Sequence, residues 1–186
     1  MSVRLQKRRF TVEEYYRMAE TGILSEHDRV ELIDGEIVEM PAIGSRHAAC
    51  VDRLTRLFSL RVGETAIVRV QNPIRLGPYT EPQPDLALLR PRPDFYASAH
   101  PTAEDTLLVV EVADASIEYD RTVKMPLYAR AGIVEAWVVD LAAGAVEVYR
   151  VPTPQGYRDV GRASRGDALS VRALAGVSLT VDEVVG

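Results

Sequence analysis

The stretch TLLVVEVADASIEYDRTVKMPLYARAGIVEAWVVDL, residues 106–141, contains three consecutive elements of secondary structure. The aliphatic run at its start predicts a strand covered on both faces. The segment 116–132 has helical apolar spacing, with Ser116 as N-cap, Pro126 bending its first turns and Gly132 at its end. VEAWVVDL, 134–141, predicts another buried strand. A strand, a helix and a strand in succession indicate an α/β protein.

Working outward, the chain adds elements on both sides of this stretch. Upstream lie a helix at about 46–61 and β-rich runs in 66–76 and 84–91, so the central order is helix, strand, strand, strand, helix, strand. We interpret this order as one mixed sheet with helices packed on it. The chain also predicts an N-terminal helix at about 12–20 with a Thr11–Glu14 capping box, an N-terminal hairpin turning at Asp34-Gly35, and a C-terminal hairpin in 145–163. No internal repeat, linker or low-complexity segment divides the chain, so residues 1–186 are expected to form one domain.

Composition narrows the class of protein. The 186 residues carry a formal net charge of −5, which argues against a non-specific nucleic-acid coat protein. The single cysteine, Cys50, allows neither an internal disulfide nor a cysteine-based zinc site, and we expect it to pack as a small hydrophobe. No apolar run is long enough to span a membrane. A cytoplasmic location is therefore expected.

Two acidic residues stand in or against aliphatic runs. Asp85 precedes the run LALL, and Glu111 ends the run LLVV. Each has an ordinary explanation, Asp85 as a turn residue and Glu111 as a solvated strand end. Carboxylates at the ends of adjacent central strands are, however, natural ligands for Mg²⁺ or Mn²⁺, and the carbonyl of Val112 would add a third oxygen. An unpaired buried charge is costly, which favours such compensation.

Lys124 lies on the predicted helix that follows Glu111. A lone helical lysine usually faces solvent, but this helix must cover the sheet, so its first half can reach back over the strand ends. An ammonium there would hold an attacking water and stabilise negative charge on a phosphate. Two acids, a divalent ion and a lysine are the minimal equipment for metal-assisted phosphodiester hydrolysis.

These residues carry a resemblance to known proteins. The PD pair, the EVA triplet and DRTVKMPLYARAGIVEAWVVDL together resemble the PD-(D/E)XK nuclease superfamily, and more narrowly the Uma-two family of restriction-endonuclease-like proteins. FTVEEYYRMAE, VELIDGEIVEM, SRHAACVDRLTRLF and YTEPQPDLALL resemble that family's opening helix, hairpin, second helix and metal-acid strand. In this family the motif lysine has moved from the strand to the next helix, which explains why Ala113 stands two residues after Glu111.

Other residues are candidates for supporting roles, and the resemblance places the helix of His47 near the site. His47 would orient a water or contact the scissile phosphate, and Glu36 would be a third acid. Gln71 would hydrogen-bond a catalytic water, while Glu81 and Asp120 would support the site, Asp120 by pairing with Lys124 four residues later. Each of these residues also has an ordinary explanation as a surface or capping group. Arg4, Lys7, Arg8 and Arg9 form a basic arm whose contacts are either phosphates or solvent.

The functional hypothesis is a Mg²⁺- or Mn²⁺-dependent endonuclease that hydrolyses DNA. A homodimer is expected by analogy with restriction enzymes of this fold. This argument rests on the fold alone. The main alternative is a catalytically inactive nuclease fold that serves as a binding or regulatory module. A hydrolase of a smaller phosphate ester is a third option.

Overall fold

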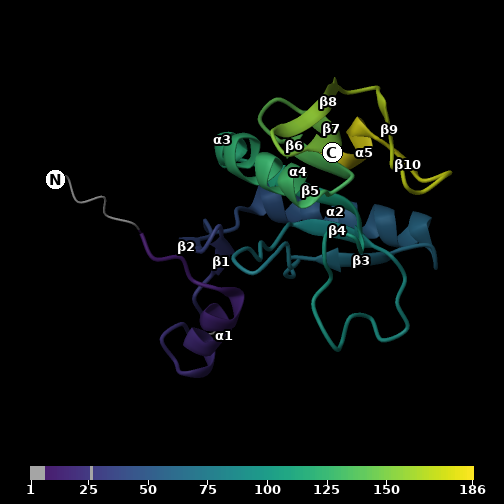
Figure 1. Cartoon of the computed structure of the whole chain (residues 1–186). Helices are drawn as coiled ribbons and strands as arrows, with labels where there is room; N and C mark the ends of the chain where they lie inside the picture. Colours follow the sequence, from purple (N-terminus) through teal and green to yellow (C-terminus); the bar gives the residue numbers. More distant parts are fainter. Residues whose placement is uncertain (1–6, 26) are drawn as a thin grey trace.

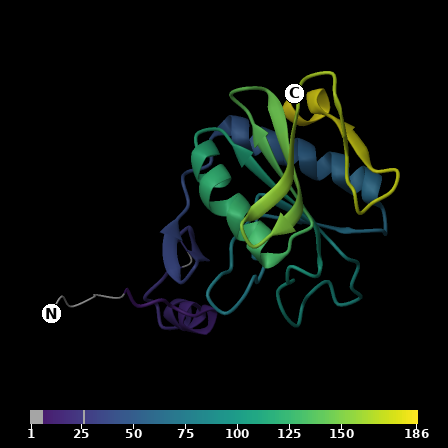
Figure 2. The same cartoon turned by 45° about the horizontal axis from the view of Figure 1, so that its top comes forward.

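A six-stranded mixed sheet lies at the centre of the fold, between two layers of helix (Figures 1 and 2). The structure is a computed structural model that describes residues 7–25 and 27–186. In spatial order the sheet consists of β3 (Ile67–Val70), β4 (Leu86–Leu89), β5 (Thr106–Ala113), β6 (Glu135–Asp140), β7 (Ala145–Thr153) and β8 (Gly156–Ala163).

The stretch 106–141 forms the parallel part of this sheet. β5 and β6 pair in parallel, with Val110 opposite Trp137, whereas the other neighbours pair antiparallel. Parallel neighbours need a crossover connection, and the helical segment between the two strands supplies it. Every residue of β5 and β6 is buried, as their nearly continuous apolar runs predict.

Alternation along the strands divides the core into two layers. One face of the sheet packs on α2 (Ser45–Val62) and includes Leu88, Val110 and Trp137. The other face packs on α4 (Met125–Ala131) and includes Val109. Because successive strand residues point to opposite faces, Glu111 shares the face of Val109 and therefore points toward the α4 side.

The crossover helix is interrupted, which differs from the single helix predicted over 116–132. It consists of α3 (Ile117–Tyr119), the π-helical turn η1 (Asp120–Lys124) and α4. Pro126 explains the change: it has no N–H to donate, and its ring would collide with the carbonyl four residues earlier in a regular α-helix. In η1 the N–H of Met125 reaches the carbonyl of Asp120, the wider i+5 bond of a π-helix.

The N-terminal elements form as the sequence predicts. α1 (Val12–Glu20) begins with the Thr11–Glu14 capping box. β1 (Val30–Ile33) and β2 (Glu36–Glu39) form a separate two-stranded sheet that turns at Asp34 and Gly35, both with positive φ. This hairpin contacts the chain that leads into β4 through a β-bridge between Leu32 and Glu81.

The C-terminal segment closes the α2 side of the sheet. The predicted hairpin is β7–β8. A second hairpin, β9 (Ala168–Ser170) with β10 (Ser178–Thr180), follows it and was not predicted. The chain ends in α5 (Val181–Val185), whose Val185 carbonyl accepts a hydrogen bond of 2.7 Å from Arg53 of α2. Cys50 is a buried free thiol in this layer, as expected. Among the described residues, no helix combines the length and apolar character that a membrane crossing requires.

Candidate metal and catalytic site

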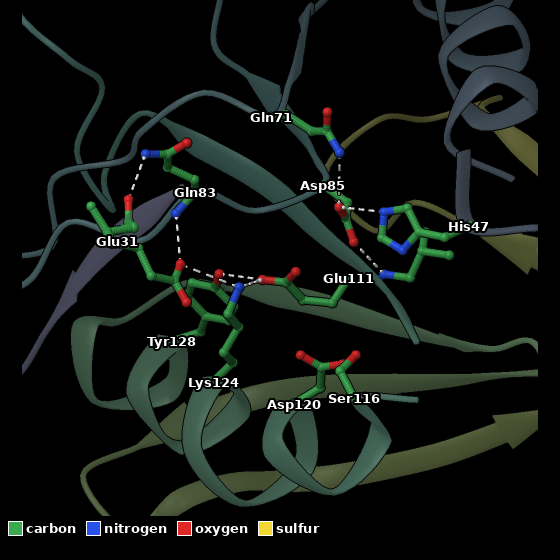
Figure 3. Close-up of polar contacts among 12 residues, drawn as sticks. Glu31, His47, Gln71, Gln83, Asp85, Glu111, Ser116, Asp120, Lys124 and Tyr128 are labelled. Atoms are coloured by element: carbon green, nitrogen blue, oxygen red, sulfur yellow. Dashed lines mark hydrogen bonds and ion pairs between the residues drawn. The ribbon is translucent and has the colours of Figure 1, made fainter. Parts of the chain in front are cut away.

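The sequence-predicted acids and lysine meet where β4 begins and β5 ends. There, the first turn of α2 and the π-turn η1 approach the strand ends from opposite faces of the sheet (Figure 3). A pocket of about 410 Å³ opens at this point. Its polar lining consists of Arg29, Glu31, Glu39, His47, Gln83, Asp85, Glu111, Asp114, Ser116, Tyr119, Asp120 and Lys124.

Asp85 is held by three donors. Its Oδ1 lies 2.9 Å from Nε2 of His47 and accepts a longer bond of 3.4 Å from Gln71 Nε2. Its Oδ2 accepts a bond of 2.8 Å from the N–H of Val112 (Figure 3). The hydrogen bond that His47 donates to Asp85 raises the pKa of His47, and burial opposes that rise. Asp85 is therefore fixed against the end of β5.

Val112 presents its peptide group to this corner of the site. The N–H and C=O of one strand residue point to the same side of the strand. Since the Val112 N–H reaches Asp85, its carbonyl faces the same side, beyond the first residue of β4. The role of this carbonyl as a ligand for a divalent ion stays a prediction.

Glu111 is buried beneath the pocket. Its Oε1 accepts a 2.5 Å hydrogen bond from the hydroxyl of Tyr128 and lies 3.2 Å from Nζ of Lys124. Its Oε2 accepts no hydrogen bond from the described residues (Figure 3). Tyr128 is fully buried in the core, and its hydroxyl also orients Glu111.

Lys124 bridges two acids. Nζ lies 3.2 Å from Glu111 and 3.4 Å from Oε2 of Glu31, and the residue is only 6% exposed. Glu31 comes from β1 and also accepts a bond from the N–H of Gln83. The sequence analysis did not identify Glu31, although it stands in the aliphatic run VELI as Asp85 and Glu111 stand in theirs. The third acid beside the lysine is therefore Glu31.

The pocket has more negative than positive charge. Burial raises the pKa of Glu111 to about 8, Lys124 lowers it, and Asp85 and Asp120 raise it further. Burial lowers the pKa of Lys124, but the carboxylates of Glu111 and Glu31 outweigh burial, so the ammonium stays protonated. One ammonium thus faces several acids, and a cation bound there would relieve their repulsion.

The two predicted supporting acids, Asp120 and Glu81, are each hydrogen-bonded to a hydroxyl group. Asp120 lines the pocket, but it accepts a 2.7 Å bond from Ser116 instead of pairing with Lys124. The π-turn explains the difference. In a regular α-helix residues four apart lie on the same face, but the π-turn winds more widely and moves Lys124 out of line with Asp120. Glu81 is buried outside the pocket lining and accepts a 2.5 Å bond from Tyr16.

Glu36 is the clearest correction to the predicted site. It follows the hairpin turn on β2, is exposed, and pairs with Lys7 at 3.0 Å. The basic arm is likewise engaged within the chain: Arg8 pairs with Glu14, and Arg9 pairs with Asp34 at 3.5 Å. Arg4 lies outside the described residues.

The donor set fits Mg²⁺ or Mn²⁺. Within residues 7–25 and 27–186, no three His, Cys, Asp or Glu side chains form a ready-made metal cluster. Asp85, Glu111 and the Val112 carbonyl instead offer two carboxylates and one backbone oxygen. That set suits Mg²⁺, which takes oxygen ligands and retains several waters. The free Oε2 of Glu111 and the surplus of buried acids support the assignment.

The Tyr128 hydroxyl gives a prediction about stability. Tyr128→Phe is expected to lower the free energy of unfolding by about 1.5–3 kcal/mol, because it removes a buried hydrogen bond to a carboxylate. Tyr157→Phe is the matched control, since the Tyr157 hydroxyl donates to the neutral carbonyl of Ile133 and should contribute about 1 kcal/mol. Urea denaturation followed by circular dichroism measures both. Equal losses would contradict a special role for the Glu111 contact.

A mixed sheet flanked by helices, with acids at the strand ends and a lysine on the crossover, defines a protein of the restriction-endonuclease-like fold. The sequence profile of the Uma2 family, described as "Putative restriction endonuclease", matches residues 12–182. The chain belongs to the Uma2 family. The expectations for the family and for the fold class are both confirmed.

A solved structure agrees on the fold. The crystal structure of a protein from Anabaena variabilis ATCC 29413, described as a putative nuclease belonging to DUF820, matches with a TM-score of 0.72 and 15% sequence identity. The match covers 95% of this chain and 97% of the other. At that identity the likeness establishes the fold alone. No curated protein shows a significant match to the chain.

Proposed function

We propose that this chain is a nuclease that hydrolyses DNA phosphodiester bonds with Mg²⁺ or Mn²⁺. The observation that carries the proposal is the convergence of Asp85, Glu111 and Lys124 in one pocket from three separate elements. Membership of a family described as restriction endonucleases supports the same class of chemistry. We also propose that residues 1–186 act as one domain, in the cytoplasm and as a homodimer.

Asp85, Glu111 and the Val112 carbonyl would hold the ion. When bound, a divalent ion supplies charge neutralisation and a water of lowered pKa. The protein contributes the fixed positions of these oxygens. His47 and the Val112 N–H set the orientation of Asp85, while Tyr128 sets that of Glu111.

Lys124 supplies the positive charge that belongs to the chain itself. Its ammonium holds the attacking water by a hydrogen bond and stabilises the negative charge that develops on the phosphate. Glu31 and Glu111 keep it protonated and aimed into the pocket. His47, which is hydrogen-bonded to Asp85, contacts the incoming phosphate or its water, and Gln71, directly after β3, also holds Asp85. Asp120 adds negative charge near the ion without contacting Lys124.

A cleavage assay tests the proposal. Purified protein is incubated with supercoiled plasmid and with linear DNA, in Mg²⁺, in Mn²⁺ and in EDTA. We expect nicked or linear products with either ion and none in EDTA. Absence of cleavage, together with no thermal stabilisation by Mn²⁺, would instead identify an inactive binding module. RNA of the same sequence distinguishes the preferred nucleic acid.

Glu31→Gln tests the acid that the sequence analysis missed. The change removes one of two charged partners of Lys124, so we expect cleavage to fall about 10- to 100-fold, the usual effect of losing a group that positions another. Glu36→Gln is the matched control on the same hairpin, because Glu36 faces Lys7 and should leave the rate unchanged. The ratio of initial rates at saturating Mn²⁺ measures the effect. If the two variants are alike, Glu31 has no special role.

A further inference from the structure

One wall of the pocket is mostly apolar. It consists of the end of β2 and the chain that follows, where Val38, Met40, Pro41, Ala42 and Ile43 line the same pocket as the acids. Ile43 is 43% exposed and therefore lies outside the core. An ion and a phosphate need no apolar partner, so this wall is available to another part of the substrate.

Two contacts hold this wall in place. The N–H of Met40 donates to the carbonyl of Arg29 at 2.7 Å, and Nη1 of Arg29 donates to the carbonyl of Pro41 at 2.9 Å. Further along, Arg46 pairs with Asp114 at 3.2 Å, which joins α2 to the segment after β5. The apolar wall is thus tied to Arg29, and the helix that follows the wall is tied to the segment after β5.

Tyr119 forms part of the wall on the η1 side. Its hydroxyl is buried, and it has no hydrogen-bond partner among the described residues. Burial, reinforced by the charge of Glu31, raises the pKa of Tyr119 to about 12, so the hydroxyl stays a neutral donor. A buried hydroxyl without a partner is costly, and a bound group with an acceptor oxygen or nitrogen would satisfy it.

The reactive groups are also deep. Glu31, Glu111 and Lys124 are 2%, 3% and 6% exposed, so an external phosphate reaches them only through the pocket. A volume of about 410 Å³ falls in the range of sites that enclose one small ligand. An intact duplex is far wider than such a site, whereas one nucleotide taken out of the base stack fits a pocket of this volume.

We propose that the pocket binds a single unpaired nucleotide, with its phosphate at Lys124 and its sugar and base between Ile43 and Tyr119. The preferred substrate is then a single strand or an unpaired DNA end, in place of an intact duplex. This inference rests on the proposed nuclease function and specifies its substrate class. Stacking on Tyr119 and contact with an aliphatic wall tolerate every base, so little sequence preference is expected.

Three end-labelled DNAs of one sequence test the inference: a single strand, a blunt duplex and a duplex with a single-stranded tail. In Mn²⁺ we expect the single strand and the tail to be cut about 5- to 150-fold faster than the blunt duplex, the factors that correspond to about 1–3 kcal/mol for stacking of one base. Anisotropy with the same DNAs in Ca²⁺ measures binding separately from cleavage.

Two variants place the effect at the wall. Ile43→Glu should lower single-strand cleavage about tenfold, whereas Ile23→Glu, the same change at an exposed isoleucine outside the pocket lining, should not. Tyr119→Phe should raise KM for the single strand about fivefold and leave kcat nearly unchanged. The reason is that the lost hydroxyl contact contributes to substrate binding and takes no part in the chemical step.

The outcomes separate the two proposals. Equal cleavage of all three DNAs would overturn the inference and leave the nuclease function in place. Tight binding of the single strand that depends on Ile43, without cleavage of any DNA, would support the inference and overturn the nuclease function. If neither cleavage nor preferential binding is seen, both proposals fail.

Discussion

Lys124→Met is expected to reduce DNA cleavage by about 100- to 1000-fold, the effect of losing one charged group that stabilises a transition state. The same change should lower the free energy of unfolding by about 3–5 kcal/mol without metal. The reason is that Nζ is the cation shared by Glu31 and Glu111, and its removal leaves these two buried acids without a cationic partner.

The metal provides a second measurement on this variant. Because a bound cation replaces part of the lost charge, Mn²⁺ should raise the melting temperature of Lys124→Met more than that of the wild type. Lys7→Met is the matched control, since Lys7 is exposed and its pair with Glu36 contributes little. Rates are compared only where circular dichroism shows a folded protein. A folded Lys124→Met that cuts DNA at the wild-type rate would refute the assigned role.

Asp85→Asn is expected to weaken Mn²⁺ binding by at least about 100-fold and to lower cleavage by a similar or larger factor. Asparagine keeps the shape of the side chain and one oxygen that can accept from the Val112 N–H, but it removes the charge that attracts the ion. Isothermal calorimetry with Mn²⁺ measures the affinity directly.

Comparison with two other variants makes the test specific. Lys124→Met should bind Mn²⁺ at least as tightly as the wild type while losing activity, whereas Asp85→Asn should lose both. Asp159→Asn, an exposed acid on β8, should lose neither. Unchanged Mn²⁺ affinity in Asp85→Asn would show that the ion, if it binds, is held elsewhere.

Local sequence signals were sufficient for much of the fold. The capping box at Thr11 and the Asp34-Gly35 turn depend on neighbouring residues only, and both form as predicted. The interrupted crossover helix was not predicted, because a bend at Pro126 does not say whether the chain continues as an α- or a π-turn. The β9–β10 hairpin was also missed, since its strands are three residues each and carry little alternation.

The site could be predicted where a charge stands in an aliphatic run. That signal identified Asp85 and Glu111, and the structure brings both into the pocket with Lys124 and His47. Glu31 carries the same signal but was passed over, while Glu36, beside an obvious turn, was chosen and faces Lys7 instead. The catalytic and metal-binding roles of Asp85, Glu111, Lys124 and His47 remain predictions.

The contacts of Tyr128 and Gln83 could not be predicted from the sequence. The Tyr128 hydroxyl reaches Glu111, and the Gln83 N–H reaches Glu31. Both depend on how the crossover helix and the hairpin lie relative to the sheet, which no local pattern of residues specifies.

The hairpin β1–β2 shares no ladder with the six-stranded sheet, yet it carries Glu31 and leads into the apolar wall of the pocket. A proteolytic cut that released residues before Pro41 would therefore take away a carboxylate and part of that wall while leaving every strand pair of the large sheet intact. We therefore expect enzymatic competence to be lost without loss of the global fold. Circular dichroism would report an intact sheet in a cleaved chain whose pocket lacked these residues.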